Sequence, residues 1–504
     1  MRPAYYREQW TLIKPAPTPE QLRSLAQRVA SIFIDRYFYS DEYNAEYIEL
    51  LCEMATCFED PSLNQIAART LFGTIVERLC DDFEELQTET YNRLICQVAS
   101  SLRALPGGAR LDTQLNAFHM HAEEQLYQRI ESMRLSPDAP LPADMRPRRV
   151  LVLSRVTIGA DVAVTSVICQ RLQQQYPEAE VVVLGNAKLR QIIAPESGIR
   201  VRELHYSRHG GLVERFSVWL DLVEVVNEEL DGLSAQQYLV LDPDSRLTQL
   251  GVLPLVGEHQ YRFFNSRGKP AYPAKGSISS LTNYWLDRVL GQGGFCHPAV
   301  WLSPALLDTA HRFIQRMSRL GNDAARHVIT LNLGVGGNMR KRVAGSFEAD
   351  LILSLLREPD TVVLLDMGFG EEETSRSRHI LEAASAAGFA SARLPYRELV
   401  QWQASEDVRL FGIECDVGEI ASLIARSDEF IGYDSACQHI GAALGVRTYT
   451  VFAGTNNARF IRRWHASGPN VSEIVYVDTL SREHEVDAAE LIERLRDLRK
   501  DPAR

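Results

Sequence analysis

The spacing of hydrophobic residues changes once along the chain. From the start to about residue 135, apolar side chains recur every three or four positions, as in Ile48-Leu51-Met54-Ala55 and Leu71-Ile75-Leu79, and this period predicts amphipathic helices. Pro61 with polar neighbours is typical of a helix start. The proline-rich stretch 136–147 then resists both helix and sheet pairing. We therefore predict an all-helical N-terminal domain over residues 1–146.

Beyond this stretch, short apolar runs alternate with amphipathic helical stretches such as Val162 to about Tyr176. The alternation is typical of βαβ units in parallel sheets. The runs that we read as strands are 149–154, 181–184, 238–241, 328–331, 362–365 and 448–452.

The alternation occurs twice, over about 148–265 and 326–480. A helical stretch, Leu302–Leu320, and the loop 321–323 separate the two occurrences. The sequence thus predicts an α/β protein with two Rossmann-like domains, residues 147–320 and 321–504. Their strands would direct their carboxyl ends into a shared cleft, where such sheets bind ligands.

Composition narrows the function classes. The 504 residues are 45% hydrophobic and 24% charged, which fits about three globular domains. A net charge of -12 disfavours nucleic-acid binding because phosphates would be repelled. The N-terminus MRPAYYREQW lacks a secretory layout, and no apolar run approaches the roughly 18 residues of a membrane span, so we expect a cytoplasmic protein. The eight scattered cysteines lack a CxxC pair and predict free thiols.

The strongest local pattern is the segment Phe430–Gly445. A strand is expected to end at Ile431, Asp434 to cap a helix that opens at Ser435, and Gly445 to end it in the left-handed conformation. The unpaired amides of such a helix would favour a diphosphate in the cleft. His439 would share that face, although an ordinary capped helix with a core histidine has the same spacing.

This segment resembles the Gly-x-Asp-Ser-Gly-x-x-His-Leu-Ala signature of the heptosyltransferase-like glycosyltransferases, family nine, which have a GT-B fold. The stretch 420–428 before it and Phe452–Arg459 after it resemble that family's preceding helix and its Phe-Gly-x-Thr-x-x-x-Arg loop. The resemblance extends from Arg148 to near the C-terminus. It implies that the donor is bound by Asp434, Ser435, Ala436, His439, Gly454 and Thr455, although the family has Gly where this chain has Ala436.

A glycine-rich loop, Asn332–Arg342, follows the strand at 328–331. Gly334 and Gly336 would let the backbone approach a ligand, and the three cations at its end could neutralise a diphosphate. The loop resembles the family's Pro-Gly-rich loop that ends in Lys-Arg-Trp-Pro, with Lys341 at the basic position and Val343-Ala344 in place of Trp-Pro. A solvated surface turn is the alternative.

Carboxylates supply two further candidates. The acidic run 371–373 follows the next strand, and the resemblance implies that Glu372, with Glu373 close behind, binds the nucleotide ribose. A favourable interaction with a helix dipole would also explain the run. The loop Ser154–Thr165 resembles the family's Gly-Asp-x-x-x-Thr loop, with Ala160 for Gly, and this makes Asp161 the catalytic base. A helix N-cap is the alternative for Asp161.

No metal site is expected. Asp242-Pro243-Asp244 has the spacing of a metal-binding DxD pair, but proline and aspartate also favour a turn, and we interpret the segment as one. Cys296-His297 and His119-x-His121 lack further ligands at suitable spacing.

The resemblance implies an inverting, metal-independent glycosyltransferase related to lipopolysaccharide biosynthesis. It would move a sugar, heptose being one candidate, from a nucleoside-diphosphate donor to a glycan, lipid-linked saccharide or protein acceptor. The nucleotide sugar is a co-substrate, and no cofactor is expected. A nucleotide-sugar epimerase on the same fold and a non-catalytic sugar-nucleotide-binding protein are the alternatives. The helical domain could bind an acceptor, a second copy or the cytoplasmic face of the inner membrane.

Overall fold

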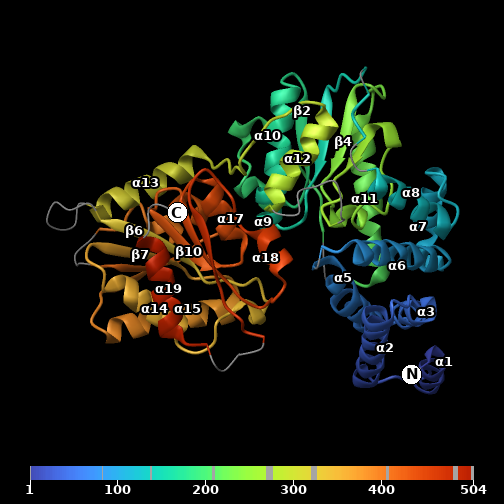
Figure 1. The fold of residues 1–504 in the computed structure, drawn as a ribbon, viewed down its shortest axis with the longest axis horizontal. Helices are drawn as coiled ribbons and strands as arrows, with labels where there is room; N and C mark the ends of the chain where they lie inside the picture. The colour runs from blue at the N-terminus through green and yellow to red at the C-terminus, as the bar shows by residue number, and fades with distance from the viewer. Residues whose placement is uncertain are drawn as a thin grey trace.

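The computed structural model describes residues 2–81, 83–136, 139–142, 144–206, 210–267, 276–318, 326–403, 408–480 and 486–500. Within these ranges every helix before the first strand belongs to one N-terminal region, here called the helical segment (residues 2–135), as predicted (Figure 1). Its helices are α1 (Pro3–Ile13), α2 (Pro19–Ser40), α3 (Ala45–Met54), α4 (Pro61–Thr70), α5 (Glu77–Asp81), α6 (Glu85–Arg103), α7 (Ala109–Ala117) and α8 (Glu123–Leu135), with a π-helical turn η1 (Leu71–Val76) between α4 and α5.

Local sequence explains where these helices begin. Thr18 caps α2 with a capping box, in which its hydroxyl accepts the Gln21 amide and the Gln21 side chain accepts the Thr18 amide. Asp60 caps α4, whose first residue is Pro61, as the sequence predicts. The buried face of the segment is continuous with the five-stranded sheet described next, because one apolar core contains Phe33 and Leu94 together with Leu151 and Trp219.

The first sheet is parallel and has the strand order β3-β2-β1-β4-β5. Leu151 of β1 pairs with Val182 on one side and Val240 on the other, so the order reverses at β1. Ligands of such sheets bind where the order reverses, at the carboxyl ends. The strands are β1 (Arg149–Leu153), β2 (Glu180–Gly185), β3 (Ile199–Glu203), β4 (Tyr238–Asp242) and β5 (Tyr261–Phe263), with α9 (Ile158–Ala160), the π-helical turn η3 (Asp161–Thr165), α10 (Ser166–Gln175), α11 (Leu212–Leu230) and α12 (Ile278–Leu290).

The second sheet is also parallel, with the strand order β12-β11-β10-β6-β7-β9-β8. Its strands are β6 (His327–Asn332), β7 (Thr361–Asp366), β8 (Ser391–Pro395), β9 (Leu410–Glu414), β10 (Glu429–Tyr433), β11 (Arg447–Phe452) and β12 (Ser472–Tyr476). Its helices are α13 (Pro304–Ser318), α14 (Phe347–Leu356), α15 (Gly370–Ala386), α16 (Val417–Ile424), α17 (Ala436–Ala443), α18 (Ala458–Trp464) and α19 (Ala488–Lys500).

The predicted strands are all present, and the structure adds five. The strands β3, β5, β8, β9 and β12 escape the sequence pattern. Four of them, β3, β5, β8 and β12, are edge strands. Three of these, β3, β8 and β12, have half-exposed polar positions, so they lack the continuous apolar run of a buried strand. β10 also continues to Tyr433, two residues past the predicted end at Ile431. The predicted domain junction at 320/321, the loop 321–323 and the linker residues 137 and 138 lie outside the described residues.

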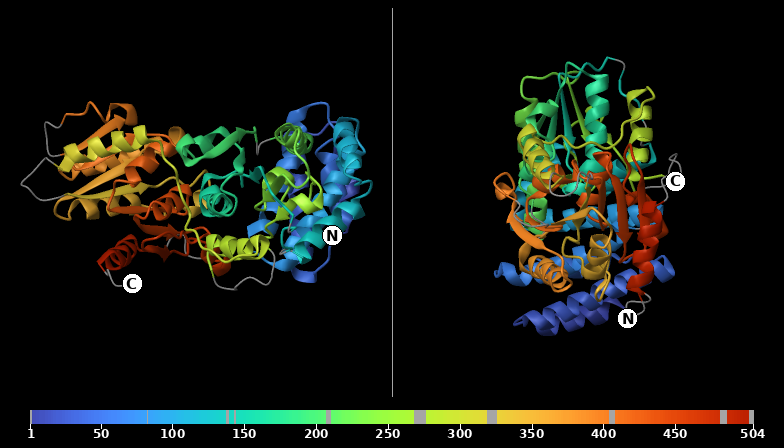
Figure 2. Two further views of the ribbon diagram at one scale, coloured as in Figure 1. Left: turned by 90° about the horizontal axis from the view of Figure 1, so that it is seen from above. Right: turned by 90° about the vertical axis from the view of Figure 1, so that its left-hand side faces the viewer.

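The molecule has three parts, namely the helical segment, the five-stranded sheet with its helices and the seven-stranded sheet with its helices. The helical segment and the five-stranded sheet are stacked on one side, and the seven-stranded sheet with its helices forms a second lobe beside them (Figures 1 and 2). Below, the five-stranded sheet with its helices is called the first lobe. None of the helices in the described ranges combines the length and the apolar character needed to cross a bilayer.

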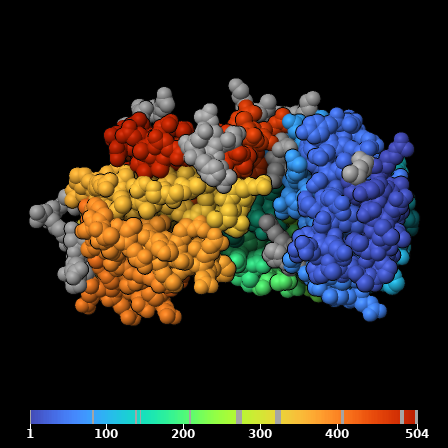
Figure 3. All heavy atoms as spheres, turned by 90° about the horizontal axis from the view of Figure 1, so that it is seen from below, coloured from blue at the N-terminus to red at the C-terminus, as the bar shows by residue number. Residues whose placement is uncertain are grey.

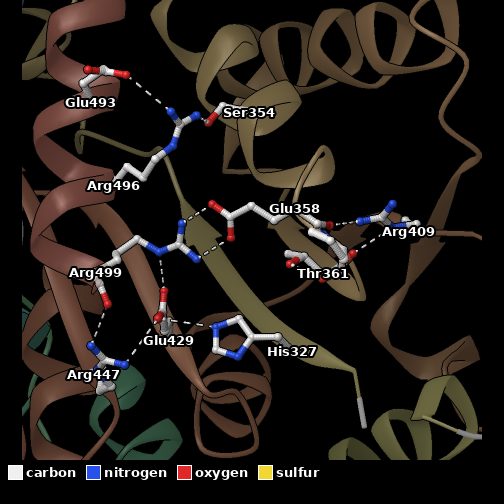
Figure 4. Close-up of polar contacts among 11 residues, drawn as sticks. His327, Ser354, Glu358, Thr361, Arg409, Glu429, Arg447, Glu493, Arg496 and Arg499 are labelled. Atoms are coloured by element: carbon white, nitrogen blue, oxygen red, sulfur yellow. Dashed lines mark hydrogen bonds and ion pairs between the residues drawn. The ribbon is translucent and has the colours of Figure 1, made fainter. Parts of the chain in front are cut away.

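A polar network fastens α19 to the amino edge of the seven-stranded sheet (Figure 4). Arg499 pairs with Glu429, the first residue of β10, at 2.5 Å, and with Glu358 at 2.7 Å. His327, the first residue of β6, lies 3.4 Å from the other Glu429 oxygen. Burial alone would raise the pKa of Glu429, but the hydrogen bond from His327 and the charge of Arg499 lower it overall.

Glu429→Gln tests this network. The Glu429 side chain is 4% exposed, so neutralising it leaves Arg499 short of a buried partner, and we expect the free energy of unfolding to fall by about 3 kcal/mol. Urea unfolding measures the change. The control Glu493→Gln alters a 72% exposed residue of α19 that pairs with Arg496 outside this network, and it should cost less than about 0.5 kcal/mol. Because the pKa of Glu429 is lowered from 4.5, the difference from wild type should persist above pH 4.5 and shrink as pH falls through the folded-state pKa. Equal effects of both variants would contradict this account.

Candidate active site

A cleft of about 960 Å³ lies between the two lobes at the carboxyl ends of their strands. It brings together most of the residues that the sequence singles out, namely Gly336, Lys341, Asp434, Ser435, Ala436, His439, Gly454 and Thr455. The first lobe contributes the segment Thr157–Ala160 to the opposite wall. Gly334, Glu372 and Asp161 are not among the lining residues.

The helix α17 opens onto this cleft, one residue later than the sequence suggests. Ser435, not Asp434, is the N-cap, and Ala436 is the first helical residue. The Ser435 side chain makes no capping hydrogen bond and instead donates to Asn332 Oδ1 at 3.2 Å. The first turn of α17 therefore faces the cleft with its positive dipole end and without a side-chain cap from Ser435. Gly445, just past the helix, has φ +74°, as predicted.

Asp434 has a different role from the predicted cap. Its carboxylate pairs with the Lys341 ammonium at 2.5 Å and accepts a hydrogen bond from Gln438 at 2.6 Å. This ion pair holds Lys341 beside the amino end of α17. An anion bound there would meet a cation and helix amides together, which is the arrangement that a diphosphate needs.

His439 lies on the cleft side of α17 but is almost buried, at 5% exposure. Its ring meets the Trp464 ring edge-on, with 5.9 Å between centroids. Burial, with smaller contributions from the positive charges of Lys341 and His465, lowers the pKa of His439 to about 3. His439 is therefore a neutral imidazole near pH 7, able to hydrogen-bond a ligand but not to pair with phosphate as a cation.

The glycine-rich loop needs glycine for conformational reasons. Gly336 and Gly337 have φ of +59° and +81°, a region that L side chains seldom adopt, and a short helical turn η8 (Met339–Lys341) then presents Lys341. Gly334 does not line the cleft, and an added Cβ there would stand 3.4 Å from a Glu373 oxygen. Its role in donor binding stays a prediction.

The acidic run at the start of α15 divides differently from the prediction. The Glu372 side chain is 71% exposed, pairs with Arg376 at 2.7 Å and is not among the residues that line the cleft. Glu373, the second candidate, accepts the amides of Val335 at 3.3 Å and Phe369 at 2.9 Å. Helix phase decides this difference, because consecutive residues point about 100° apart, and the sequence alone does not fix that phase.

Asp161 is not a helix cap, because Thr157 caps α9 and Asp161 begins the π-helical turn η3. Its carboxylate is 2% exposed and accepts hydrogen bonds at 2.7 Å from the Ser154 hydroxyl, the Arg155 amide and the Thr165 hydroxyl. Burial raises the pKa of Asp161 to about 6 despite these hydrogen bonds. Asp161 does not line the cleft, and it directly follows the lining segment 157–160 in the sequence.

The two lobes touch where α9 meets α17. A Cβ built on Gly159 would come within 3.1 Å of Ala436 Cα and 3.2 Å of His439 Cδ2, so the absence of a side chain permits this approach. The Ala436 methyl lies 3.7 Å from the same point. Ala436, which stands where the resembling signature has glycine, therefore faces a residue without a side chain, Gly159.

The Asp242-Pro243-Asp244 segment forms the predicted turn. Asp242 accepts the Ser245 amide at 2.6 Å, and Asp244 pairs with Arg267 at 3.0 Å in the interior. Across the described ranges, no three His, Cys, Asp or Glu side chains gather closely enough to hold a metal ion, and all eight cysteines are free thiols.

The helical segment also reaches the cleft, which sequence reasoning missed. Gly73, Glu77 and Arg78 line it from η1 and α5. These residues belong to no motif, and the helical periodicity of the region marks only which side chains are buried. These residues reach the cleft because the tertiary structure places α5 beside the second lobe. No local sequence pattern predicts that placement.

Gly454→Ala tests whether the position of Lys341 beside the amino end of α17 matters for anion binding. A Cβ at Gly454, where φ is +79°, would stand 2.7 Å from the Arg340 carbonyl and 2.9 Å from the Lys341 amide, so the backbone that carries Lys341 must shift. We expect affinity for inorganic pyrophosphate, measured by calorimetry, to fall about tenfold or more. Gly388→Ala is the matched control, because Gly388 has φ +87° with nothing within 4 Å. Equal losses in both variants would attribute the effect to backbone strain alone.

Comparison with known proteins gives several structural similarities and one family match, which lies in the second lobe. No curated protein sequence matches the chain. The chain is similar to the solved structure of a family 9 glycosyl transferase from Veillonella parvula (15% identity over 71% of this chain and 90% of that chain, TM-score 0.45). It is also similar to ADP-heptose lipopolysaccharide heptosyltransferase II of E. coli (14% identity over 69% of this chain and 98% of that chain, TM-score 0.43). A third similar structure is E. coli heptosyltransferase WaaC with ADP (15% identity over 69% of this chain and 99% of that chain, TM-score 0.43).

Residues 396–488 match the family model of glycosyltransferase family 9 (heptosyltransferase). This stretch contains β10, α17 and the Gly454 turn, and α17 and Gly454 contribute to the second-lobe wall of the cleft. The second lobe of the chain is therefore similar, over residues 396–488, to glycosyltransferase family 9 (heptosyltransferase).

Proposed function

We propose that the chain transfers a sugar, with inversion and without a metal ion, from a nucleoside-diphosphate donor to a hydroxyl of a glycan, lipid-linked saccharide or protein. The observation that carries the proposal is the cleft itself. Its second-lobe wall presents Lys341 and the amino end of α17, and its first-lobe wall presents Thr157–Ala160, the segment that Asp161 follows in the sequence. The two functions that transfer requires, holding a diphosphate and activating a hydroxyl, thus come from opposite lobes.

The donor diphosphate would lie against Lys341 and the first turn of α17. As the sugar departs, negative charge grows on the diphosphate, and a cation with aligned amides stabilises that charge at the moment it forms. Asp434 keeps Lys341 in place before the donor arrives. Gly336, Gly454 and Thr455 would complete the donor side, and the neutral His439 would hydrogen-bond the donor. The family match makes a heptose the first sugar to test.

Asp161 would be the general base. A pKa of about 6 makes its carboxylate a stronger base than an ordinary aspartate, yet ionised at pH 7. Asp161 is buried and does not line the cleft, so the adjoining segment 157–160 would have to shift to expose it when an acceptor enters. Val156 has φ +62°, a costly conformation for a β-branched residue, and strain of this kind collects where a backbone changes state.

A nucleotide panel tests the donor site. At 100 times its dissociation constant, a bound nucleotide should stabilise the protein by about 2.7 kcal/mol, which raises the melting temperature. We expect one or more of ADP, GDP, UDP and CDP to do so, and Lys341→Met to abolish the shift. The control Lys14→Met removes a lysine that pairs with Glu53 at 2.8 Å far from the cleft, and it should keep the shift.

The same panel, repeated with nucleotide sugars, separates the competing functions. A transferase needs an acceptor, whereas an epimerase converts its donor alone. If no nucleoside diphosphate or nucleotide sugar changes the melting temperature of the wild-type chain, the proposed donor site is wrong. Conversion of the donor sugar in the absence of any acceptor would favour the epimerase.

Asp161→Asn tests the base. We expect transfer to fall by about 10²- to 10⁴-fold while nucleotide affinity stays near the wild-type value. In the wild type, kcat/KM should decline as pH falls below about 6, because the base becomes protonated, and the variant should lack this limb. Asp242→Asn is the matched control, since Asp242 is also buried in the first lobe with a pKa raised by burial to about 6. An acidic limb that survives in Asp161→Asn would remove Asp161 from this role.

A further inference from the structure

The helical segment touches the second lobe at Phe83 and Glu84, just after the cleft-lining residues of α5. The Phe83 ring packs against Phe460 and Trp464 of α18, with centroid separations of 6.3 and 6.4 Å. Arg459 of the same helix donates to the Phe83 carbonyl at 2.7 Å and pairs with Glu84 at 2.7 Å. Figure 3 shows the helical segment, in blue, meeting the orange-red part of the second lobe, with the surface hollowed beside the contact.

Phe83 differs from the rest of its segment in the core to which it belongs. The other buried apolar side chains of the segment, within the described ranges, pack into the core shared with the five-stranded sheet. Phe83, 6% exposed, instead belongs to the core that joins Val152 of the first sheet to Phe430 of the second. Its φ of +54° shows that the backbone adopts an unfavourable conformation to place the ring there.

Trp464 connects Phe83 to the proposed donor site. It lines the cleft, and its ring meets Phe83 from the helical segment, the His439 ring from α17 and, at 5.8 Å, the Arg155 guanidinium from the first lobe. All three parts of the molecule therefore meet at one indole. Removing the Phe83 ring would leave a void on one side of Trp464, and neighbouring side chains relax into such voids only in part.

We infer that Phe83 is a positioning residue of the donor site, through which the helical segment holds Trp464 against His439. The inference rests on the proposed nucleotide-sugar site. His439 stays neutral because it is buried, and Trp464 supplies part of that burial. If Trp464 moved, water would reach His439 and the first turn of α17 would lose the packing that orients it toward a diphosphate.

The experiment compares nucleotide affinity with stability in two variants. Phe83→Ala should weaken binding of the nucleoside diphosphates ADP, GDP, UDP and CDP, measured in parallel by calorimetry, by about tenfold for each one that the wild type binds. Phe33→Ala is the control, because Phe33 is fully buried in the other core of the helical segment. It should lower the melting temperature at least as much as Phe83→Ala, yet leave the dissociation constants within about twofold of wild type. Phe83→Tyr, which keeps the ring, should restore most of the affinity.

Each outcome decides between the two proposals. Wild-type affinity in Phe83→Ala would overturn the positioning role and leave the donor site standing. Equal losses of affinity in Phe83→Ala and Phe33→Ala would also overturn it, because the effect would then follow stability alone. Failure of the wild type to bind any of the four nucleotides would overturn the donor site itself, and the inference with it.

Discussion

The approach of α9 to the first turn of α17 is the contact on which the candidate site depends. It brings a loop of the first lobe against the helix end that would bind diphosphate, and it exists because Gly159 has no side chain. The base candidate Asp161 follows Gly159 by two residues, and Lys341 is fixed beside the same helix end by Asp434. A single close backbone contact thus sets the spacing between the two halves of the proposed chemistry. Anything that widened it would separate them without changing either half.

Much of the fold could be predicted from the sequence, for an identifiable reason. Strands such as β1 and β10 are buried on both faces, so they appear as continuous apolar runs, whereas the edge strands β3 and β8 mix polar and apolar positions. Residues in tight backbone motifs, such as Gly336 and Gly445, could be placed because their chemistry is local. The directions of Glu372 and Asp161 could not, because they depend on helix phase and on an unexpected π-helical turn.

The helical segment shows the limit of local patterns most clearly. Its periodicity predicts helices, but not that Glu77 and Arg78 face the cleft or that Phe83 leaves the core of its own segment for another. These placements arise from packing between parts of the chain that are hundreds of residues apart, as in the ion pair between Glu84 and Arg459. The segment is therefore better regarded as a third wall of the candidate site than as an attachment to the two lobes.

The shared core between the helical segment and the five-stranded sheet has a consequence for how the chain reaches its native state. Synthesis begins with the helices, whose apolar faces are completed by Leu151, Val182 and Trp219, residues that leave the ribosome later. Until then the newly made helices expose a broad hydrophobic surface. Such surfaces recruit chaperones or self-associate. Expression of the first 146 residues alone would leave that surface permanently uncovered. The region that completes the cleft is thus also the one most dependent on the remainder of the polypeptide for its solubility.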